Sequence, residues 1–460
     1  MRKEKDTLGE IEVPEEANYG VQTARAVSNF PISGIKPHPV FIRASAMVKW
    51  AAAQANLSCG KLDRHVGKAI MKASEEVISG RWNNEFVVDV FQAGAGTSHN
   101  MNTNEVIANL AILSQGGRRG EYKLIHPNDH VNMSQSTNDV FPTAIRVAAL
   151  LLLRPFGASI TKLQKAFALK SREFDPIVKS GRTHLQDAVP IRLGQEFGAY
   201  ARAISRAKDR VGNAQESLRE VGIGGSAVGT GINTHRRYQK EVVRALSKIS
   251  GLTLVPTKNL IERMQSMADF VEVSGALREL ALELIRIAND LRLLASGPRT
   301  GFFEIVLPPV QPGSSIMPGK VNPVMAELTN MVCYQVLGND LTISMAAQAG
   351  QLELNVMMPV ISFNLLQSIE ILTHTMGVFA DRCIKGITAN RERCQELADQ
   401  SIGLATILNP SIGYEAAASV AKEAMATGKS LRQIVVDRRI LSKEEVDRVL
   451  DPARMTEPRD

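Results

Sequence analysis

The sequence of 460 residues predicts an all-α protein built around a bundle of long helices. Hydrophobic residues make up 44% of the chain but aromatic residues only 5%, so the core must be aliphatic and rich in methionine, which suits helices. Apolar side chains then alternate at spacings of three and four, the pattern of long packed helices: Phe270, Val273, Leu277, Leu280, Leu284, Ile287, Leu291 and Leu294. Gly297 and Pro298 end this helix.

The other elements follow in chain order. Residues 1–40 are rich in proline and glycine and read as an irregular or short-strand entry segment. Residues 41–114 are helical, with an interruption around Gly94 and Gly96. Further long helices are predicted at 143–175, 191–219, 325–347 and 357–386, and their apolar faces are too broad for one partner helix, which indicates a large bundle and association of subunits. From about residue 390 the chain is more charged and is punctuated by Asn409-Pro410, Gly413 and Gly428, which indicates a small separate helical domain.

Composition excludes several classes of protein. The hydrophobic content, with charged residues at 22%, excludes intrinsic disorder. The four cysteines form no CxxC pair, which argues against a disulfide framework and a zinc site and favours a reducing cytoplasm. The net charge of +7 comes from scattered basic residues without interleaved aromatic residues, so we expect no nucleic-acid partner. The N-terminus has no apolar signal segment, and the apolar run from Val147 to Leu153 is far shorter than the roughly 18 residues of a membrane span.

Four polar, glycine-bearing segments interrupt the helical pattern, at 94–102, 126–139, 181–187 and 313–323. Each offers hydroxyl or amide side chains and free backbone N–H groups, which are the donors that bind carboxylates. Any one of them alone is explained by a helix cap or a turn. Four together, with cations or imidazoles among their residues, indicate a site for a small anion.

Other chemistries fit the residues less well. The glycines of 222–231 lack a preceding buried strand and a GK[ST] ending, so a turn is expected there and not a nucleotide loop. His126 and His130 are spaced as metal ligands on a helix would be, but the intervening Pro127 and Asn128 argue against a helix, and no metal site is expected. Ser314 and His184 suggest a hydrolase, yet no GxSxG elbow surrounds the serine.

The segment Gly313-Ser314-Ser315-Ile316-Met317-Pro318-Gly319-Lys320-Val321-Asn322-Pro323 resembles the GSSxMPxKxNP loop of the aspartase/fumarase superfamily. The other three segments match in order and spacing, and the resemblance extends over essentially the whole chain. It implies three mostly helical regions, which we place at 1–138, 139–389 and 390–460. It also implies a long central bundle that assembles into the core of a homotetramer, with active sites shared between subunits.

Within the superfamily, Ser134-Gln135-Ser136-Thr137-Asn138-Asp139 is similar to the aspartate ammonia-lyase branch, because fumarases usually have Ser where Thr137 stands. Residues 294–299 and 401–403 point to the same branch. In contrast, His126-Pro127-Asn128-Asp129 and His184 are typical of fumarases, so fumarate hydratase is the alternative. A non-catalytic helical scaffold, as in lens crystallins of the superfamily, is a third hypothesis that the intact Ser314 and Lys320 disfavour.

The resemblance also implies roles for individual residues, with a small dicarboxylate as substrate and no cofactor. Ser314 is the expected base, and His184 contacts the amino end of the substrate together with Asn138. The remaining substrate-binding residues fall into two groups. Donors to the reacting carboxylate are Thr97, Ser136, Thr137 and Ser315; ligands of the other carboxylate are Thr183, Lys320 and Asn322.

Overall fold

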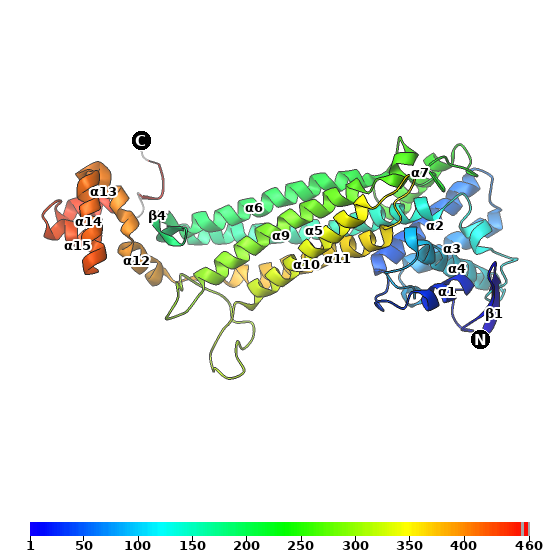
Figure 1. Cartoon of the computed structure of the whole chain (residues 1–460), viewed down its shortest axis with the longest axis horizontal. Coiled ribbons are helices and arrows are strands. Elements are labelled where there is room, and N and C mark those ends of the chain that lie inside the picture. The colour runs from blue at the N-terminus through cyan, green and yellow to red at the C-terminus, as the bar shows by residue number, and fades with distance from the viewer. Residues whose placement is uncertain (452–454, 459–460) are drawn as a thin grey trace. The chain divides into compact units, whose positions relative to one another are not determined.

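A computed structural model describes residues 1–451 and 455–458 of the chain (Figure 1). The five longest helices lie within a few residues of the predicted positions, except that α5 starts at residue 137 and not at 143. They are α5 (Thr137–Phe174), α6 (Leu193–Ala214), α9 (Ala268–Leu294), α10 (Val324–Gln348) and α11 (Met358–Arg382). The predicted stripe of α9 is buried from Phe270 to Leu294. The all-α prediction is therefore confirmed, and the fold is a helical bundle.

The shorter elements lie mostly toward the two ends of the sequence. The remaining α-helices are α1 (Val21–Asn29), α2 (Pro39–Ser58), α3 (Arg64–Ile78), α4 (Thr97–Ser114), α7 (Tyr238–Ser250), α8 (Leu260–Gln265), α12 (Arg391–Gln400), α13 (Ala405–Ile412), α14 (Tyr414–Thr427), α15 (Leu431–Asp437) and α16 (Lys443–Val449). Single turns of other helix types are η1 (Asn83–Glu85), η2 (Gly94–Gly96), η3 (Pro127–Val131), η4 (Gln215–Arg219), η5 (Ile384–Gly386) and η6 (Ile402–Leu404).

Within residues 1–451 and 455–458, strands form only two-stranded ribbons. Three are antiparallel: β1 (Arg2–Asp6) with β2 (Gly9–Val13), β3 (Val178–Thr183) with β4 (Gln186–Arg192), and β7 (Ile305–Val306) with β8 (Thr388–Ala389). The fourth, β5 (Glu220–Val221) with β6 (Val255–Pro256), is parallel. Isolated two-stranded ribbons are marginally stable in water, so each must be held by the helices and loops beside it.

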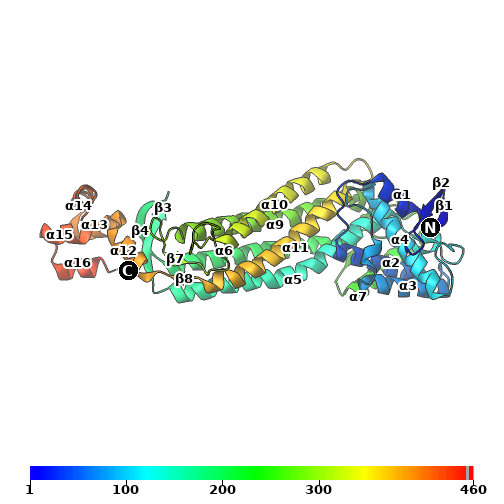
Figure 2. The ribbon, with the colours of Figure 1, turned by 90° about the horizontal axis from the view of Figure 1, so that it is seen from below.

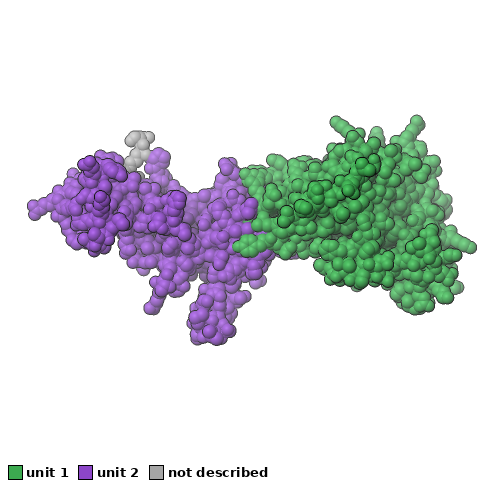
Figure 3. Space-filling model, in the orientation of Figure 1, with its two compact units in different colours: residues 1–158, 209–281, 334–373 green, residues 159–208, 282–333, 374–460 purple. Residues whose placement is uncertain are grey.

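By its internal contacts the chain divides into two compact units (Figure 3). Unit 1 comprises residues 1–158, 209–281 and 334–373, and unit 2 comprises residues 159–208, 282–333 and 374–460. All five long helices contribute residues to both units. This division follows contacts, whereas the three regions expected at 1–138, 139–389 and 390–460 follow the sequence and stay a prediction.

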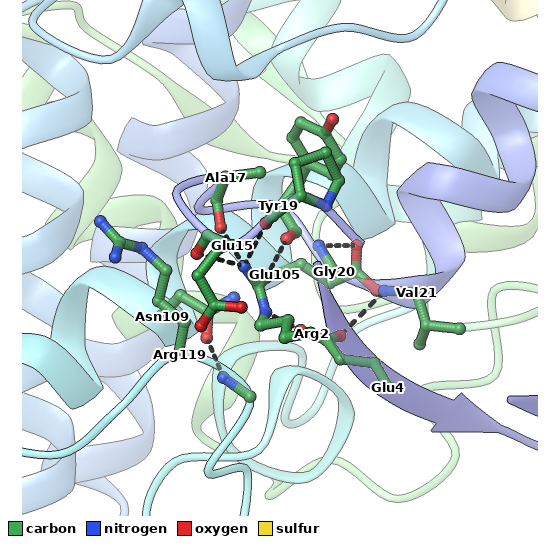
Figure 4. A network of polar contacts seen from close by, with 12 residues as sticks. Arg2, Glu4, Glu15, Ala17, Tyr19, Gly20, Val21, Glu105, Asn109 and Arg119 are labelled. Atoms are coloured by element: carbon green, nitrogen blue, oxygen red, sulfur yellow. Dashed lines mark hydrogen bonds and ion pairs between the residues drawn. The ribbon is translucent and has the colours of Figure 1, made fainter. Parts of the chain in front are cut away.

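In unit 1, one hydrophobic cluster joins α2, α3 and α4 with Phe86, Ile125 and Val131. The entry segment is fixed beside it by Arg2, whose guanidinium donates to the carbonyl oxygens of residues 14, 15, 17 and 19 (Figure 4). The buried carboxylate of Glu105 accepts from the backbone N–H groups of Gly20 and Thr23. These contacts start α1, a helix that the sequence analysis missed within residues 1–40.

Figure 2 shows the ribbon of the long helices from a second side. Polar side-chain pairs connect these helices within each unit, and the pair in unit 1 is buried. In unit 1, Arg146 of α5 donates to Asp269 of α9 at 2.7 and 3.1 Å. In unit 2, Asn330 of α10 donates to Asn289 of α9 at 2.8 Å. The C-terminal helices α13 to α16 of unit 2 share a hydrophobic cluster of their own, which includes Leu408, Val420 and Ile434 among other residues.

Two expectations need correction. Residues 127–131 form one π-helical turn, because the ring of His126 accepts from the backbone N–H groups of Asn128 and Asp129 and so starts a helix despite Pro127. Helix α5 is also longer and more apolar than the run from Val147 to Leu153 suggested, and by length and composition alone it could cross a membrane. Of its most apolar window, 67% is buried inside the protein, as in a core helix.

Candidate active site

The first predicted segment places Thr97 at the first residue of α4. Gly96 before it has φ +84°, and a Cβ at this position would lie 2.1 Å from the ring of Phe141. Only glycine fits both the left-handed backbone and the close approach of the ring. Thr97 is consequently exposed at a helix N-terminus, and the N-terminal end of a helix favours an anion.

The second segment places Ser136, Thr137 and Asn138 at the start of α5. The amide nitrogen of Asn138 donates to the carbonyl oxygen of Ala227 at 2.8 Å, which fixes its side chain. The carboxylate of Asp139 accepts from the backbone N–H groups of Ser136 at 3.0 Å and Ser226 at 2.9 Å. Because burial outweighs these hydrogen bonds, the pKa of Asp139 rises to about 6.

Lys49 of α2 joins these two segments. Its ammonium group is completely buried and donates to side-chain oxygens of Asn100 at 2.7 Å, Asn132 at 3.0 Å and Gln135 at 3.0 Å. Asn100 lies one turn beyond Thr97, and Gln135 directly precedes Ser136. Burial disfavours the charged form and lowers the pKa of Lys49 to about 7, against an opposing attraction from Asp139.

The third segment is the hairpin of β3 and β4, in unit 2. Thr183 pairs with Gln186, so His184 and Leu185 form a two-residue turn, with φ of 56° and 60°. Positive φ at both central residues is the usual geometry of a tight hairpin. The side chains of Thr183 and His184 are exposed, and among the described residues neither makes a hydrogen bond.

The fourth segment, residues 313–323, is a closed loop in unit 2. The N–H of Gly313 donates to the carbonyl oxygen of Lys320 at 2.8 Å, and the amide of Asn322 donates to the carbonyl oxygen of Gly313 at 2.6 Å. These two bonds bring the ends of the loop together. Lys320 and Asn322 line a cavity of about 540 Å³ beside Arg292 and Ser296.

Within this loop the hydroxyl oxygen of Ser314 accepts from two backbone N–H groups, those of Ile316 at 3.2 Å and Met317 at 2.9 Å. Two N–H groups converging on one oxygen stabilise negative charge there. Ser315 and Lys320 are exposed, and within the described part of the chain their side chains make no hydrogen bond or ion pair. The arrangement suits a serine that must lose its proton.

The ten predicted site residues thus fall into two sets. Unit 1 contains one set, and its members are Thr97, Ser136, Thr137 and Asn138. Unit 2 contains the other, and its members are Thr183, His184, Ser314, Ser315, Lys320 and Asn322.

Comparison with known proteins decides the family. Residues 9–338 match the family described as Lyase, and residues 404–457 match the family described as Fumarase C C-terminus. An aspartate ammonia-lyase from Bacillus sp is 52% identical over 458 residues, which is 100% of this chain and 98% of that protein. The aspartate ammonia-lyase of Escherichia coli (strain K12) is 46% identical over 461 residues, 100% of this chain and 96% of that protein. The chain belongs to the aspartate ammonia-lyase family of the aspartase/fumarase superfamily.

Solved structures agree with the superfamily. A structure described as fumarate lyase:delta crystallin from Brucella melitensis bound to cobalt has a TM-score of 0.97 and 50% identity, covering 99% of this chain and 100% of that one. A class II fumarase from Schistosoma mansoni has a TM-score of 0.96 but only 38% identity, with 100% of both chains covered. The lower identity to the fumarase supports the choice of branch within the superfamily.

Two buried charged residues were missed by sequence reasoning. Lys49 had a signal in the sequence, since a single lysine stands among alanines and apolar residues in 44–53. Glu304, the buried partner of Arg182, had none, because nothing in the sequence pairs it with a residue so far away. Among residues 1–451 and 455–458, no group of three or more His, Cys, Asp or Glu side chains is arranged to hold a metal ion.

Proposed function

We propose that this protein catalyses the reversible deamination of L-aspartate to fumarate and ammonia. The observation that carries the proposal is the pair of N–H groups that converge on the Ser314 hydroxyl oxygen, in a chain related over its full length to aspartate ammonia-lyases. Ser314, as an alkoxide stabilised by these N–H groups and by Lys320, takes the proton from carbon 3 of the substrate and becomes the neutral hydroxyl. The electron pair moves into the neighbouring carboxylate and forms an aci-carboxylate, and then the bond from carbon 2 to nitrogen breaks as ammonia leaves.

Proton removal builds a second negative charge on a carboxylate, so the barrier falls only where donors already point at that charge. Thr97, Ser136, Thr137 and Ser315 supply these donors in our proposal. The other carboxylate is held by Thr183, Lys320 and Asn322, with Lys320 as a point charge. Asn138 and His184 contact the amino end. No cofactor is needed in this scheme, because the adjacent carboxylate accepts the electron pair.

The leaving group separates aspartate from malate. Hydroxide leaves poorly and needs a proton donor, whereas an ammonium leaves as neutral ammonia. A site for aspartate must therefore offer acceptor oxygens to the ammonium, and Thr97, Thr137 and Asn138 each carry one. A buried ammonium without acceptors would cost several kcal/mol, enough to separate the two substrates by about a thousandfold.

The test is a comparison of kcat/KM for L-aspartate and L-malate with pure protein. Each reaction is monitored by the absorbance of fumarate. We expect aspartate to be converted at least about a thousandfold more efficiently. More efficient dehydration of malate would make the protein a fumarate hydratase and overturn the proposal.

We further propose a homotetramer with active sites shared between subunits. Helix α10 carries a stripe of exposed apolar side chains at helical spacing, formed by Met331, Tyr334, Leu341 and Met345, which are 54–65% exposed. Such a stripe on a long helix is typical of a surface that another helix covers. Light scattering would contradict this proposal if it found a stable, active monomer.

Cytoplasmic location is the last part of the proposal. All four cysteines are free, and three of them are buried: Cys333, Cys383 and Cys394. Free thiols persist in a reducing compartment. We propose no nucleic-acid or membrane partner, and cell fractionation followed by detection of the protein would test the location.

A further inference from the structure

Four charged side chains gather at the base of the β3–β4 hairpin, in unit 2, and none has a role in the proposed reaction. A single nitrogen of Arg182, Nη1, lies 3.0 Å from both carboxylate oxygens of Glu304. Lys179 Nζ lies 3.1 Å from Glu304 Oε2 and 3.2 Å from Glu196 Oε2. The Glu304 side chain is 0% exposed and that of Lys179 is 3% exposed. The charges of the group cancel, because it contains two cations and two anions.

Glu304 is also fixed through its own backbone. Its N–H donates to the carbonyl oxygen of Leu294 at 2.9 Å, at the end of α9, and its carbonyl oxygen accepts from the N–H of Asn390 at 2.9 Å. The next two residues form β7, which pairs with β8. The Glu304 carboxylate therefore leaves a backbone that is held on both sides, which makes it a rigid anchor for its partners.

The hairpin, by contrast, has little to fix its tip. The side chains of Thr183 and His184 are exposed and make no hydrogen bond within the described residues, and a two-stranded ribbon by itself is marginally stable. Arg182 immediately precedes Thr183, and its guanidinium lies 4.1 Å from the ring centroid of Phe302, two residues before Glu304. The contacts of Arg182 therefore fix the backbone of β3 at the residue directly before Thr183.

From this arrangement we propose that Glu304 is a positioning residue, which sets the place of Thr183 and His184 through its ion pairs with Arg182 and Lys179. The inference rests on the proposed function, in which Thr183 binds a carboxylate and His184 contacts the amino end. Glu304 itself touches no substrate. A misplacement of about 1 Å in a substrate-binding group costs roughly 100-fold in rate, so loss of the anchor should lower kcat/KM by about that factor.

The test uses the full-length protein and separates positioning from folding. Glu304→Gln alone leaves two cations with one anion, so this variant is expected to be less stable than the wild type. The double variant Arg182→Gln/Glu304→Gln restores the balance, because Lys179 and Glu196 remain as a pair. We expect the double variant to regain the thermal stability of the wild type and still to lose about 100-fold in kcat/KM. The matched control is Arg146→Gln/Asp269→Asn, which removes another buried ion pair, in unit 1.

Two further measurements distinguish positioning from general damage. In a Thr183→Ala/His184→Gln background, the double variant should lower kcat/KM less than threefold, because the side chains that it misplaces are already gone. An equal loss in both backgrounds would overturn the proposal, and so would wild-type kcat/KM in the double variant.

Amide hydrogen exchange of residues 183–187 should also be faster in the double variant than in the wild type, and unchanged exchange would contradict the proposal. Exchange needs no substrate, so failure of the proposed aspartate chemistry would leave this part of the test intact.

Discussion

The ammonium group of Lys49 donates a 2.7 Å hydrogen bond to Oδ1 of Asn100, one turn beyond Thr97 on α4. Through two more hydrogen bonds, to Asn132 and Gln135, the same group holds the segment that leads to Ser136. One buried cation therefore ties together both parts of the site that lie in unit 1. Burial of this charge destabilises the folded protein, and the hydrogen bonds to three acceptors offset only part of that effect.

Lys49→Met removes the donor from three side-chain oxygens and should lower kcat/KM by about 10- to 100-fold, because Thr97 and Ser136 lose their common support.

The burial of Lys49 should also make the stability of the protein depend on pH. The pKa of Lys49 is about 7 in the folded protein and 10.5 ordinarily, so between these pH values only the unfolded chain binds the proton. The contribution of Lys49 therefore makes the wild type more stable as pH rises from about 7 to 10.5. Thermal unfolding at several pH values should show this rise weakened in Lys49→Met and kept in Lys248→Met, which alters an exposed lysine of α7.

Asp139→Asn tests the opposite sign. Burial raises the pKa of Asp139 from 3.8 to about 6, so between these values the folded protein holds the extra proton. The contribution of Asp139 to stability is thus present below pH 3.8 and is lost as pH rises through 6. Denaturant unfolding should show that the stability difference between wild type and variant shrinks over this range and then stays constant. At neutral pH we expect Asp139→Asn to lower the free energy of unfolding by about 1–3 kcal/mol, because a backbone N–H that now donates to the carboxylate is left without an acceptor. An unchanged free energy of unfolding would contradict this account.

Ser314→Ala should fold and keep its assembly, because the side chain is half-buried in a polar loop and contributes little to the core. Its kcat should fall by at least about three orders of magnitude, as expected when the proton acceptor itself is removed. Steady-state kinetics with L-aspartate measures this, with Ser79→Ala on the surface of unit 1 as the control. A near-normal kcat would show that another group takes the proton.

Gly96→Ala should be destabilised by more than about 1 kcal/mol and should also lose activity, since the new Cβ meets the Phe141 ring and the positive φ disfavours it. The matched control is Gly212→Ala in α6, where a Cβ would have nothing within 4 Å. That change should be neutral or stabilise the protein by about 0.5–1 kcal/mol. Equal unfolding temperatures for the two variants would contradict the packing argument.

Leu341→Glu places a charge in the exposed stripe of α10 and should dissociate the proposed tetramer, with loss of activity because the shared sites come apart. Leu169→Glu is the control, since Leu169 is 60% exposed on α5 and Leu341 is 65% exposed on α10. The residues one turn from Leu169 on its exposed side are charged: Lys165, Arg172 and Glu173. Light scattering should give a smaller mass for Leu341→Glu only. A tetramer that survives this charge would place the interface elsewhere.

Much of this protein could be predicted from local sequence. The apolar stripe from Phe270 to Leu294 predicted α9 because helix periodicity depends only on nearby residues. The loop from Gly313 to Pro323 carried the family resemblance, and its fold is also local, since Asn322 and Gly313 close it over nine residues. Helix α1 was missed because its start depends on Glu105, more than 80 residues away in sequence.

The supports of the candidate site were decided only by tertiary structure. Lys49 meets Gln135 across 86 residues, and Arg182 meets Glu304 across 122. Neither pair leaves a periodic signal, because a long-range contact depends on how whole helices pack and not on the residues beside each partner. The sequence alone determined which segments carry groups that can donate to a carboxylate, and its family resemblance indicated Ser314 as the base. The folded chain determined what holds those groups in place, since charges far apart in sequence are paired only after packing has removed them from water.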